Sequence, residues 1–201
     1  MALVLGFTVF WAGLGLVNLD YCYLLHAVGA VLISAVSLLE DNGTTVEEML
    51  VEYSFGYFVG HGFDLVFRNT ASKVMLVHHV LALSLLVGVM LHPEFVEVKA
   101  CSHVLLTEFS TLFLYMWEKH PSESSLGAFV VTYFCSRGIY LGYFIMRIFL
   151  SKDPNDIASH LQVGPFHYLT LLLFILNMVY FSKILVPSIP RHLKKLRKID
   201  D

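Results

Sequence analysis

Residues 71–91 read ASKVMLVHHVLALSLLVGVML, an almost uninterrupted apolar run. A helix needs roughly 20 mostly apolar residues to cross the hydrocarbon core of a bilayer, and this run has that length. Two adjacent histidines, His78 and His79, lie inside it. Because ionisable side chains within a bilayer are costly and usually face a protein interior or a wet cavity, the doublet marks a candidate functional site.

The rest of the chain has the same apolar character. Hydrophobic residues make up 57% of its 201 residues, charged residues only 14%, and the mean hydropathy of +0.70 is too high for a soluble domain. Seven segments approach or meet the spanning length: residues 2–17, 21–39, 49–67, 71–91, 98–117, 126–150 and 166–187. We therefore predict an all-α polytopic membrane protein with about seven transmembrane helices and no second soluble domain.

Three parts are expected along the chain: a hydrophobic N-terminal segment (1–20), a membrane domain (21–187) and a basic tail (188–201). The first segment is short and contains three glycines, Gly6, Gly13 and Gly15. Two topologies stay open, because this segment either crosses the membrane or leaves the N-terminus on the other side. A cleaved signal peptide is not favoured, since no basic residue precedes the apolar run.

Lysine and arginine in short loops mark the cytosolic side of a membrane protein. The strongest basic cluster is residues 191–198 of the tail, which predicts a cytosolic C-terminus and places Arg68, Lys73 and Lys119 on the same side. The opposite loops carry mostly acids, namely Glu40, Asp41, Glu47, Glu48, Glu94, Glu97, Asp153 and Asp156, against Lys99 and Lys152. That side also holds a glycosylation acceptor triplet at Asn42.

Polar residues inside the helices can be grouped by helical spacing, because positions three or four apart share a face. In the third segment Tyr53, Tyr57, His61 and Asp64 form one such stripe. His61 and Asp64 lie near the predicted cytosolic end of that segment. We therefore expect the hairpin to bring them to the depth of the histidine doublet.

The fifth and sixth segments supply opposite charges. Glu108 lies near the middle of the fifth, with Thr111 on its face, and the sixth contains Arg137 flanked by Tyr133 and Tyr140. A lone carboxylate at that depth neutralises or pairs with a cation. These helices are therefore predicted to surround a polar cavity, although a purely structural ion pair between Glu108 and Arg137 stays open.

Other polar residues are expected to pack rather than react. A single buried histidine such as His26 or His103 is more often a hydrogen-bonded packing residue. In the doublet, successive residues point about 100° apart, so one imidazole can face a cavity while a neighbouring helix holds the other. The cysteines Cys22, Cys101 and Cys135 are expected as small core residues without a disulfide framework. No metal, bound cofactor or nucleic-acid partner is predicted.

The order of these motifs resembles the TLC domain, shared by translocating-chain-associating membrane proteins, Lag1-type ceramide synthases and CLN8-like proteins. The resemblance rests on VHHV at 77–80, LTEFST at 106–111 and YFCSR at 133–137, and it covers roughly residues 21–187. The Glu-x-Ser-Thr form is more similar to the smaller TLC-domain-containing proteins than to the ceramide synthases.

This resemblance implies a six-helix barrel, here preceded by one extra segment, that encloses a cavity for a long acyl chain. It also implies residence in the endoplasmic reticulum and a role in sphingolipid, ceramide or acyl-lipid metabolism. His78 and His79 would be the acyl-transfer histidines, and Glu108 would stand where the synthases have the first of two aspartates. The second aspartate aligns with Thr111, which departs from the synthase pattern.

The chemistry suits such a site, because a neutral imidazole can attack a thioester or take the proton of an attacking amine. The predicted catalytic residues are His78, His79 and Glu108. Acyl-CoA is the expected co-substrate, and membrane lipids and long-chain acyl groups are the expected partners. The predicted binding residues are His61, Asp64, Arg137, Tyr57, Thr111 and Tyr133.

Two functions remain open from the sequence. The first is an acyl-CoA-dependent N-acyltransferase, and the second is a non-catalytic protein of lipid binding or membrane lipid homeostasis, which Thr111 favours. A di-iron hydroxylase or desaturase is excluded, because Met75 stands where a histidine would complete a box before the doublet and no second box exists. A channel is not favoured, since no repeated charged lining is visible.

Overall fold

In the computed structural model, residues 2–40, 44–68, 73–151 and 164–200 are described. The candidate glycosylation site at Asn42 and the loop residues Asp41, Lys152, Asp153 and Asp156 lie outside these ranges. Over the described ranges the secondary structure is helical throughout, with no strand. The prediction of an all-α membrane protein is therefore confirmed.

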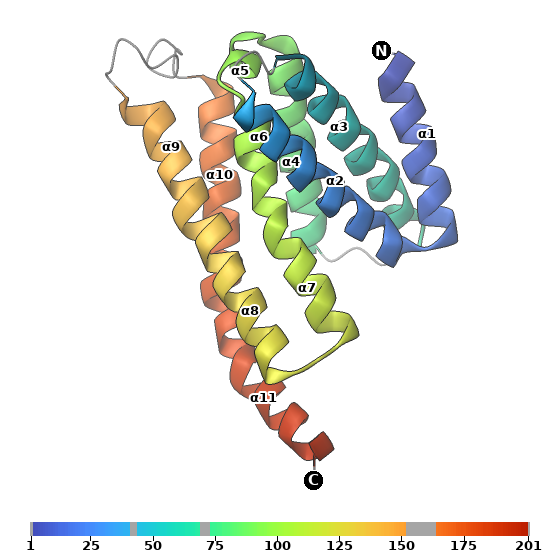
Figure 1. Cartoon of the computed structure of the whole chain (residues 1–201), viewed down its shortest axis with the longest axis vertical. Helices are drawn as coiled ribbons and strands as arrows, with labels where there is room; N and C mark the ends of the chain where they lie inside the picture. The colour runs from blue at the N-terminus through green and yellow to red at the C-terminus, as the bar shows by residue number, and fades with distance from the viewer. Residues whose placement is uncertain (1, 41–43, 69–72, 152–163, 201) are drawn as a thin grey trace.

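The helices form seven rods within the described residues, and they match the seven predicted segments (Figure 1). Four rods are single helices: α1 (Ala2–Val17), α2 (Leu19–Leu39), α3 (Thr44–Phe67) and α4 (Lys73–Leu91). After the short α5 (Glu94–Glu97), the other three each contain a non-α turn. They are α6 (Ala100–Leu105), η1 (Leu106–Glu108) and α7 (Phe109–Lys119); α8 (Glu123–Tyr133), η2 (Phe134–Tyr140) and α9 (Leu141–Leu150); and α10 (Pro165–Tyr180), η4 (Phe181–Leu185) and α11 (Val186–Asp200).

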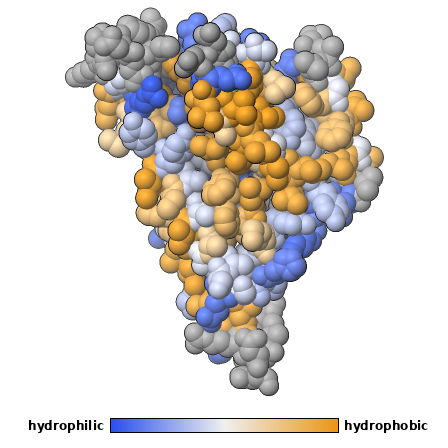
Figure 2. All heavy atoms as spheres, in the orientation of Figure 1, coloured by the Kyte–Doolittle hydropathy of each residue, from blue (hydrophilic) through white to orange (hydrophobic). Residues whose placement is uncertain are grey.

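Length and composition allow three of these helical stretches to cross a membrane: Asp20–Leu39, Glu123–Leu150 and Pro165–Lys194. Shorter apolar helices cover Val4–Leu16 and Met75–Leu91. Figure 2 shows apolar residues over much of one face, with hydrophilic residues gathered towards its two ends. Large apolar side chains within a candidate span, such as Val131 (61% exposed) and Ile139 (59% exposed), point outward, as lipid contact requires.

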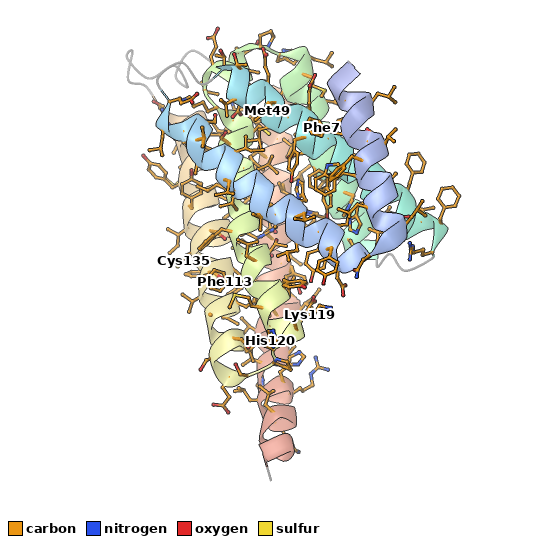
Figure 3. All side chains as sticks on the ribbon, turned by 45° about the vertical axis from the view of Figure 1, so that its right-hand side comes forward. Phe7, Met49, Phe113, Lys119, His120 and Cys135 are labelled. Atoms are coloured by element: carbon orange, nitrogen blue, oxygen red, sulfur yellow. The ribbon has the colours of Figure 1, made fainter. Side chains whose placement is uncertain are left out.

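The rods run up and down, so that the start of α1 and the end of α11 lie at opposite ends of the molecule (Figure 1). The end that holds α11 also holds Lys119 and His120, at the turn after α7 (Figure 3). There Lys119 donates a hydrogen bond to Asp20, which raises the pKa of the Lys119 ammonium. The hydroxyl of Tyr23 donates to Glu118 over 2.7 Å, so two polar contacts join α2 to α7 at this end.

Helix α1 packs closely along α3, because two glycines of α3 remove the side chains that would separate them. A Cβ built on Gly56 would lie 2.6 Å from the Cβ of Phe7, and one on Gly60 would lie 2.9 Å from the backbone N of Ala12. This is the small-xxx-small spacing that lets membrane helices approach. The Trp11 indole also donates to the Tyr53 carbonyl over 3.2 Å, so the first segment is an integral part of the bundle.

Glu47 was expected in a loop, and this expectation is wrong. Helix α3 begins at Thr44, and the Glu47 carboxylate is fully buried in its first turn. It accepts hydrogen bonds from the Ser37 hydroxyl (3.0 Å), the Ser102 backbone N (3.0 Å) and the Ser102 hydroxyl. Three donors from α2 and α6 thus replace water around the carboxylate and join three helices.

Two further features differ from expectation, namely the start of the fifth rod and the exposure of one cysteine. Lys99 adopts a left-handed conformation (φ 53°), so the fifth rod starts at Ala100 rather than at Val98. Helix continues through η4 into α11, so the predicted basic tail is helical as far as Asp200. Cys22 and Cys101 are buried as expected, whereas Cys135 is exposed on the outside of the bundle.

Candidate functional site

Glu108 and Arg137 form a buried ion pair between two rods of the bundle. Arg137 Nη2 lies 2.9 Å from Glu108 Oε1, with the two side chains only 9% and 11% exposed. Both residues lie on irregular turns: Glu108 ends the 3₁₀ turn η1, and Arg137 lies inside the π-helical turn η2. Such turns rotate side chains away from the normal helical progression and often mark functional sites.

Arg137 distributes its donors over four neighbours. Its Nε donates to the Ser110 hydroxyl (2.9 Å), its Nη1 to Asn177 Oδ1 (3.2 Å), and its Nη2 to Glu108 Oε1 and the Thr111 hydroxyl (3.2 Å). A guanidinium has five N–H groups. Four are used by these described residues, and one on Nη1 is left.

The same network links the remaining polar groups of the site. The Thr111 hydroxyl donates to Glu108 Oε2 over 2.7 Å. The Tyr133 hydroxyl donates to Asn177 Oδ1 over 3.1 Å, and its ring lies 5.4 Å from the Arg137 guanidinium carbon. Both oxygens of the carboxylate are therefore bonded, and the site is held by α7, α8, η2 and α10.

The histidine doublet is divided between two environments. His79 Nδ1 lies 3.0 Å from the Met75 carbonyl, and its Nε2 lies 3.0 Å from His61 Nδ1. Because a carbonyl only accepts, His79 Nδ1 donates, so in a neutral ring Nε2 accepts a hydrogen bond from His61 Nδ1. His79 is thus held against its own helix and α3, on the side away from the ion pair.

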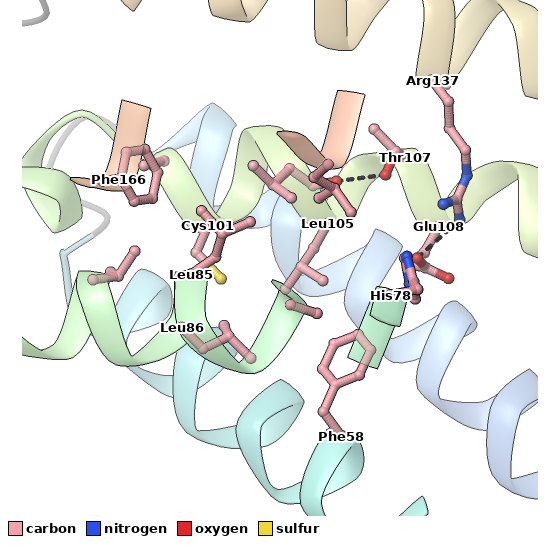
Figure 4. Close-up of a pocket in the computed structure, with 15 residues that line it drawn as sticks. Phe58, His78, Leu85, Leu86, Cys101, Leu105, Thr107, Glu108, Arg137 and Phe166 are labelled. Carbon is pink, nitrogen blue, oxygen red and sulfur yellow. Dashed lines mark hydrogen bonds and ion pairs between the residues drawn. The ribbon is translucent and has the colours of Figure 1, made fainter. Parts of the chain in front are cut away.

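His78 lies on the other side of α4, next to Glu108 and Arg137, as Figure 4 shows. It makes no hydrogen bond with another residue in the described part of the chain. Its ring packs edge-on against Phe58, with centroids 6.1 Å apart. His78 is therefore the histidine of the doublet that is placed to meet a ligand.

Two spaces meet at His78 and Arg137, which line both. The first, called the cleft, has a volume of about 430 Å³ and opens between α4, α7, α8 and α10; its polar lining includes Thr111, Asn177 and Tyr180. The second, called the slit, is a narrow apolar space of about 30 Å³ that extends from His78 to Phe166 (Figure 4). The cleft can hold part of a lipid, with its polar group at the ion pair.

The third-segment stripe does not line the cleft or the slit. Tyr57 stacks between His26 (centroids 3.7 Å apart) and His61 (5.1 Å). Asp64 lies 3.9 Å from the Arg68 guanidinium, at the end of α3. The hairpin does bring His61 against the doublet, as expected, but His61 contacts the buried His79. None of the predicted binding residues Tyr57, His61 and Asp64 lines the cleft.

His26 and His103 have the packing environments expected of them. His26 is 1% exposed, and its Nε2 lies 3.3 Å from the Ser54 hydroxyl. His103 Nδ1 lies 2.7 Å from the Tyr140 hydroxyl. Within the described residues, no group of three or more His, Cys, Asp or Glu side chains is arranged to hold a metal ion.

Asn177 and Phe58 are site residues that the sequence motifs did not indicate. Asn177 bonds both Arg137 and Tyr133, and its Nδ2 donates to the Leu173 carbonyl over 3.0 Å. A signal was present, because a lone amide within an apolar spanning helix usually bonds another helix. Phe58 carried no such signal, since an apolar residue in an apolar helix is ordinary.

Fold and site together define a polytopic membrane protein with a polar cluster beside a cleft that can hold part of a lipid. The family model of the TLC domain (TRAM, LAG1 and CLN8) matches residues 3–186. The chain belongs to this family, and the matched range includes α1. Searches of curated proteins and of solved structures gave no match. Membership indicates a function related to membrane lipids.

Proposed function

We propose that this protein takes an acyl-CoA into the cleft and transfers its acyl group to a long-chain amine at His78. The observation that carries the proposal is the position of His78, where the open cleft meets the apolar slit beside the buried ion pair. An acyl chain would lie along apolar side chains while its carbonyl meets the polar cluster. The reaction is an acyl-CoA-dependent N-acyl transfer of sphingolipid or acyl-lipid metabolism.

The residues of the site supply each step of this transfer. The amine nitrogen attacks the thioester carbonyl while the His78 imidazole takes the amine proton. The remaining Nη1 hydrogen of Arg137 donates to the oxygen that becomes negative. When the carbon–sulfur bond breaks, the CoA thiolate leaves with the proton that His78 held. Glu108 holds Arg137 in place, and His61 holds His79.

A second candidate is a lipid-binding protein that does not turn over. The observation favouring it is Thr111, which stands where a second acid would lie and whose hydroxyl is bonded to both Glu108 and Arg137. The cleft would then hold a resident lipid.

Sidedness and location belong to the proposal as well. Lys119 lies towards the end of the bundle that holds α11 and the basic tail (Figure 3), and lysine and arginine favour the cytosol. We therefore infer that this end, including the C-terminus, faces the cytosol, where acyl-CoA is available. We also propose residence in the endoplasmic reticulum, which the resemblance of the motifs implies and which microscopy tests.

The test uses purified full-length protein in lipid nanodiscs with a long-chain acyl-CoA and a long-chain amine. We expect release of CoA and formation of the amide, measured by thiol assay and mass spectrometry. His78→Gln should lower the rate at least about 100-fold, the usual contribution of a general base. His120→Gln, a matched change at the exposed turn after α7, should leave the rate unchanged.

The second candidate is separated by lipid analysis. It predicts no CoA release and a co-purifying lipid that Leu114→Trp displaces, because Leu114 lines the cleft. Met116→Trp is the control, since Met116 is exposed on the same helix. Wild-type protein with neither turnover nor bound lipid would contradict both candidates.

A further inference from the structure

We propose that the part of the cleft at His78 and Arg137 selects lipids whose polar group carries no charge, and that the Glu108–Arg137 pair sets this selectivity. The inference rests on the proposed function only in that a lipid occupies the cleft. It concerns which headgroup binds, and it holds whether or not the lipid is turned over.

The charges around the two spaces cancel. Among the residues that line the cleft or the slit, Glu108 is the one acid and Arg137 is the one lysine or arginine. They are 2.9 Å apart and about nine-tenths buried. His78 is the one histidine in these two linings, and apart from the ion pair no charged residue lines either space beside it. A ligand therefore meets a neutral site.

Hydrogen-bonding groups remain available in this neutral site. One N–H of Arg137 is not used by a described residue, and the Tyr180 hydroxyl and the His78 ring line the cleft. A hydroxyl, an amide or an ester carbonyl can bond these groups. The site thus suits polar but uncharged groups.

A charged headgroup meets the opposite situation. A phosphate beside Arg137 must compete with Glu108, which already holds that cation, and an ammonium beside Glu108 must compete with Arg137. Burying a charged group is costly unless an opposite charge is free to pair with it. The phosphates of acyl-CoA would therefore stay outside the cleft, and the acceptor amine would enter in its uncharged form, so that only neutral groups reach the ion pair.

The pair can be unbalanced by single substitutions, which should reverse the preference. Glu108→Gln leaves Arg137 as an unmatched cation with a nearly unchanged shape, so a phosphate should become the preferred headgroup. Arg137→Gln leaves Glu108 unmatched, so an ammonium should be preferred. The double variant is neutral again and should resemble the wild type.

Three probes with one hydrocarbon chain isolate the headgroup: oleyl alcohol, oleyl phosphate and oleylamine. Binding is measured at neutral pH, in uncharged detergent, from the rise in melting temperature with probe concentration. We expect the wild-type protein to bind the alcohol at least about tenfold tighter than either charged probe. Glu108→Gln should bind oleyl phosphate tightest.

The control is Glu48→Gln, which changes net charge equally at an exposed position of α3 and should leave the preference for the alcohol. Equal binding of all three probes by the wild type would overturn the inference, as would an unchanged preference in Glu108→Gln or a reversed one in Glu48→Gln. Binding of no probe at all would instead contradict the proposed occupation of the cleft by a lipid.

Discussion

Replacing Arg137 by methionine should destabilise the bundle strongly and in a way that depends on Glu108. Methionine keeps an unbranched apolar side chain but removes every donor. Four hydrogen bonds, of 2.9 to 3.2 Å, are lost to Ser110, Asn177, Glu108 and Thr111.

The magnitude follows from two contributions. Hydrogen bonds between membrane helices contribute about 0.6 kcal/mol each, which accounts for roughly 2 kcal/mol of the loss. The Glu108 carboxylate also stays buried without a cation, and breaking a buried pair costs about 3–5 kcal/mol in total. We expect the free energy of unfolding to fall by that larger amount.

The assay is reversible unfolding in mixed micelles, followed by circular dichroism, for the wild type, Arg137→Met, Glu108→Gln and the double variant. The unpaired carboxylate accounts for most of the cost of Arg137→Met. The free energy of unfolding lost in the double variant should therefore be smaller than the sum of the two single losses by at least about 1.5 kcal/mol. Lys183→Met, an exposed charge removed from η4, controls for the loss of a cation and should change stability by less than about 0.5 kcal/mol. A loss below about 1 kcal/mol in Arg137→Met, or strictly additive losses, would refute the reasoning.

Two further predictions concern the frame around the site. Gly60→Leu should push α1 away from α3, because even a Cβ would lie 2.9 Å from the α1 backbone; the melting temperature should drop and α1 should become sensitive to protease. Gly127→Leu, at a glycine with open space around it, should do neither. Glu47→Ala should lower the free energy of unfolding by about 2 kcal/mol or more, since it leaves buried donors unpaired. Chemical denaturation checks this value, and an effect no larger than that of the exposed Glu48→Ala would contradict it.

Much of the architecture could be predicted because a long apolar segment crosses a bilayer as a helix, in which its backbone hydrogen bonds are satisfied. The seven rods appear where the seven runs lie, and their ends differ mainly where a polar residue bonds across helices, as Glu47 does. The Glu108–Arg137 pair was also predictable, since each is a lone charge deep in its helix and a buried charge needs a partner.

The sequence by itself therefore determined the class of protein, the number of rods and the charges that must meet. It could not determine which histidine of the doublet faces the site. Helix α4 is apolar on nearly every side, so no polar face specifies its rotation about its own axis. Only tertiary packing, with His79 bonded to His61 and Phe58 against His78, sets that rotation and turns His78 towards Arg137.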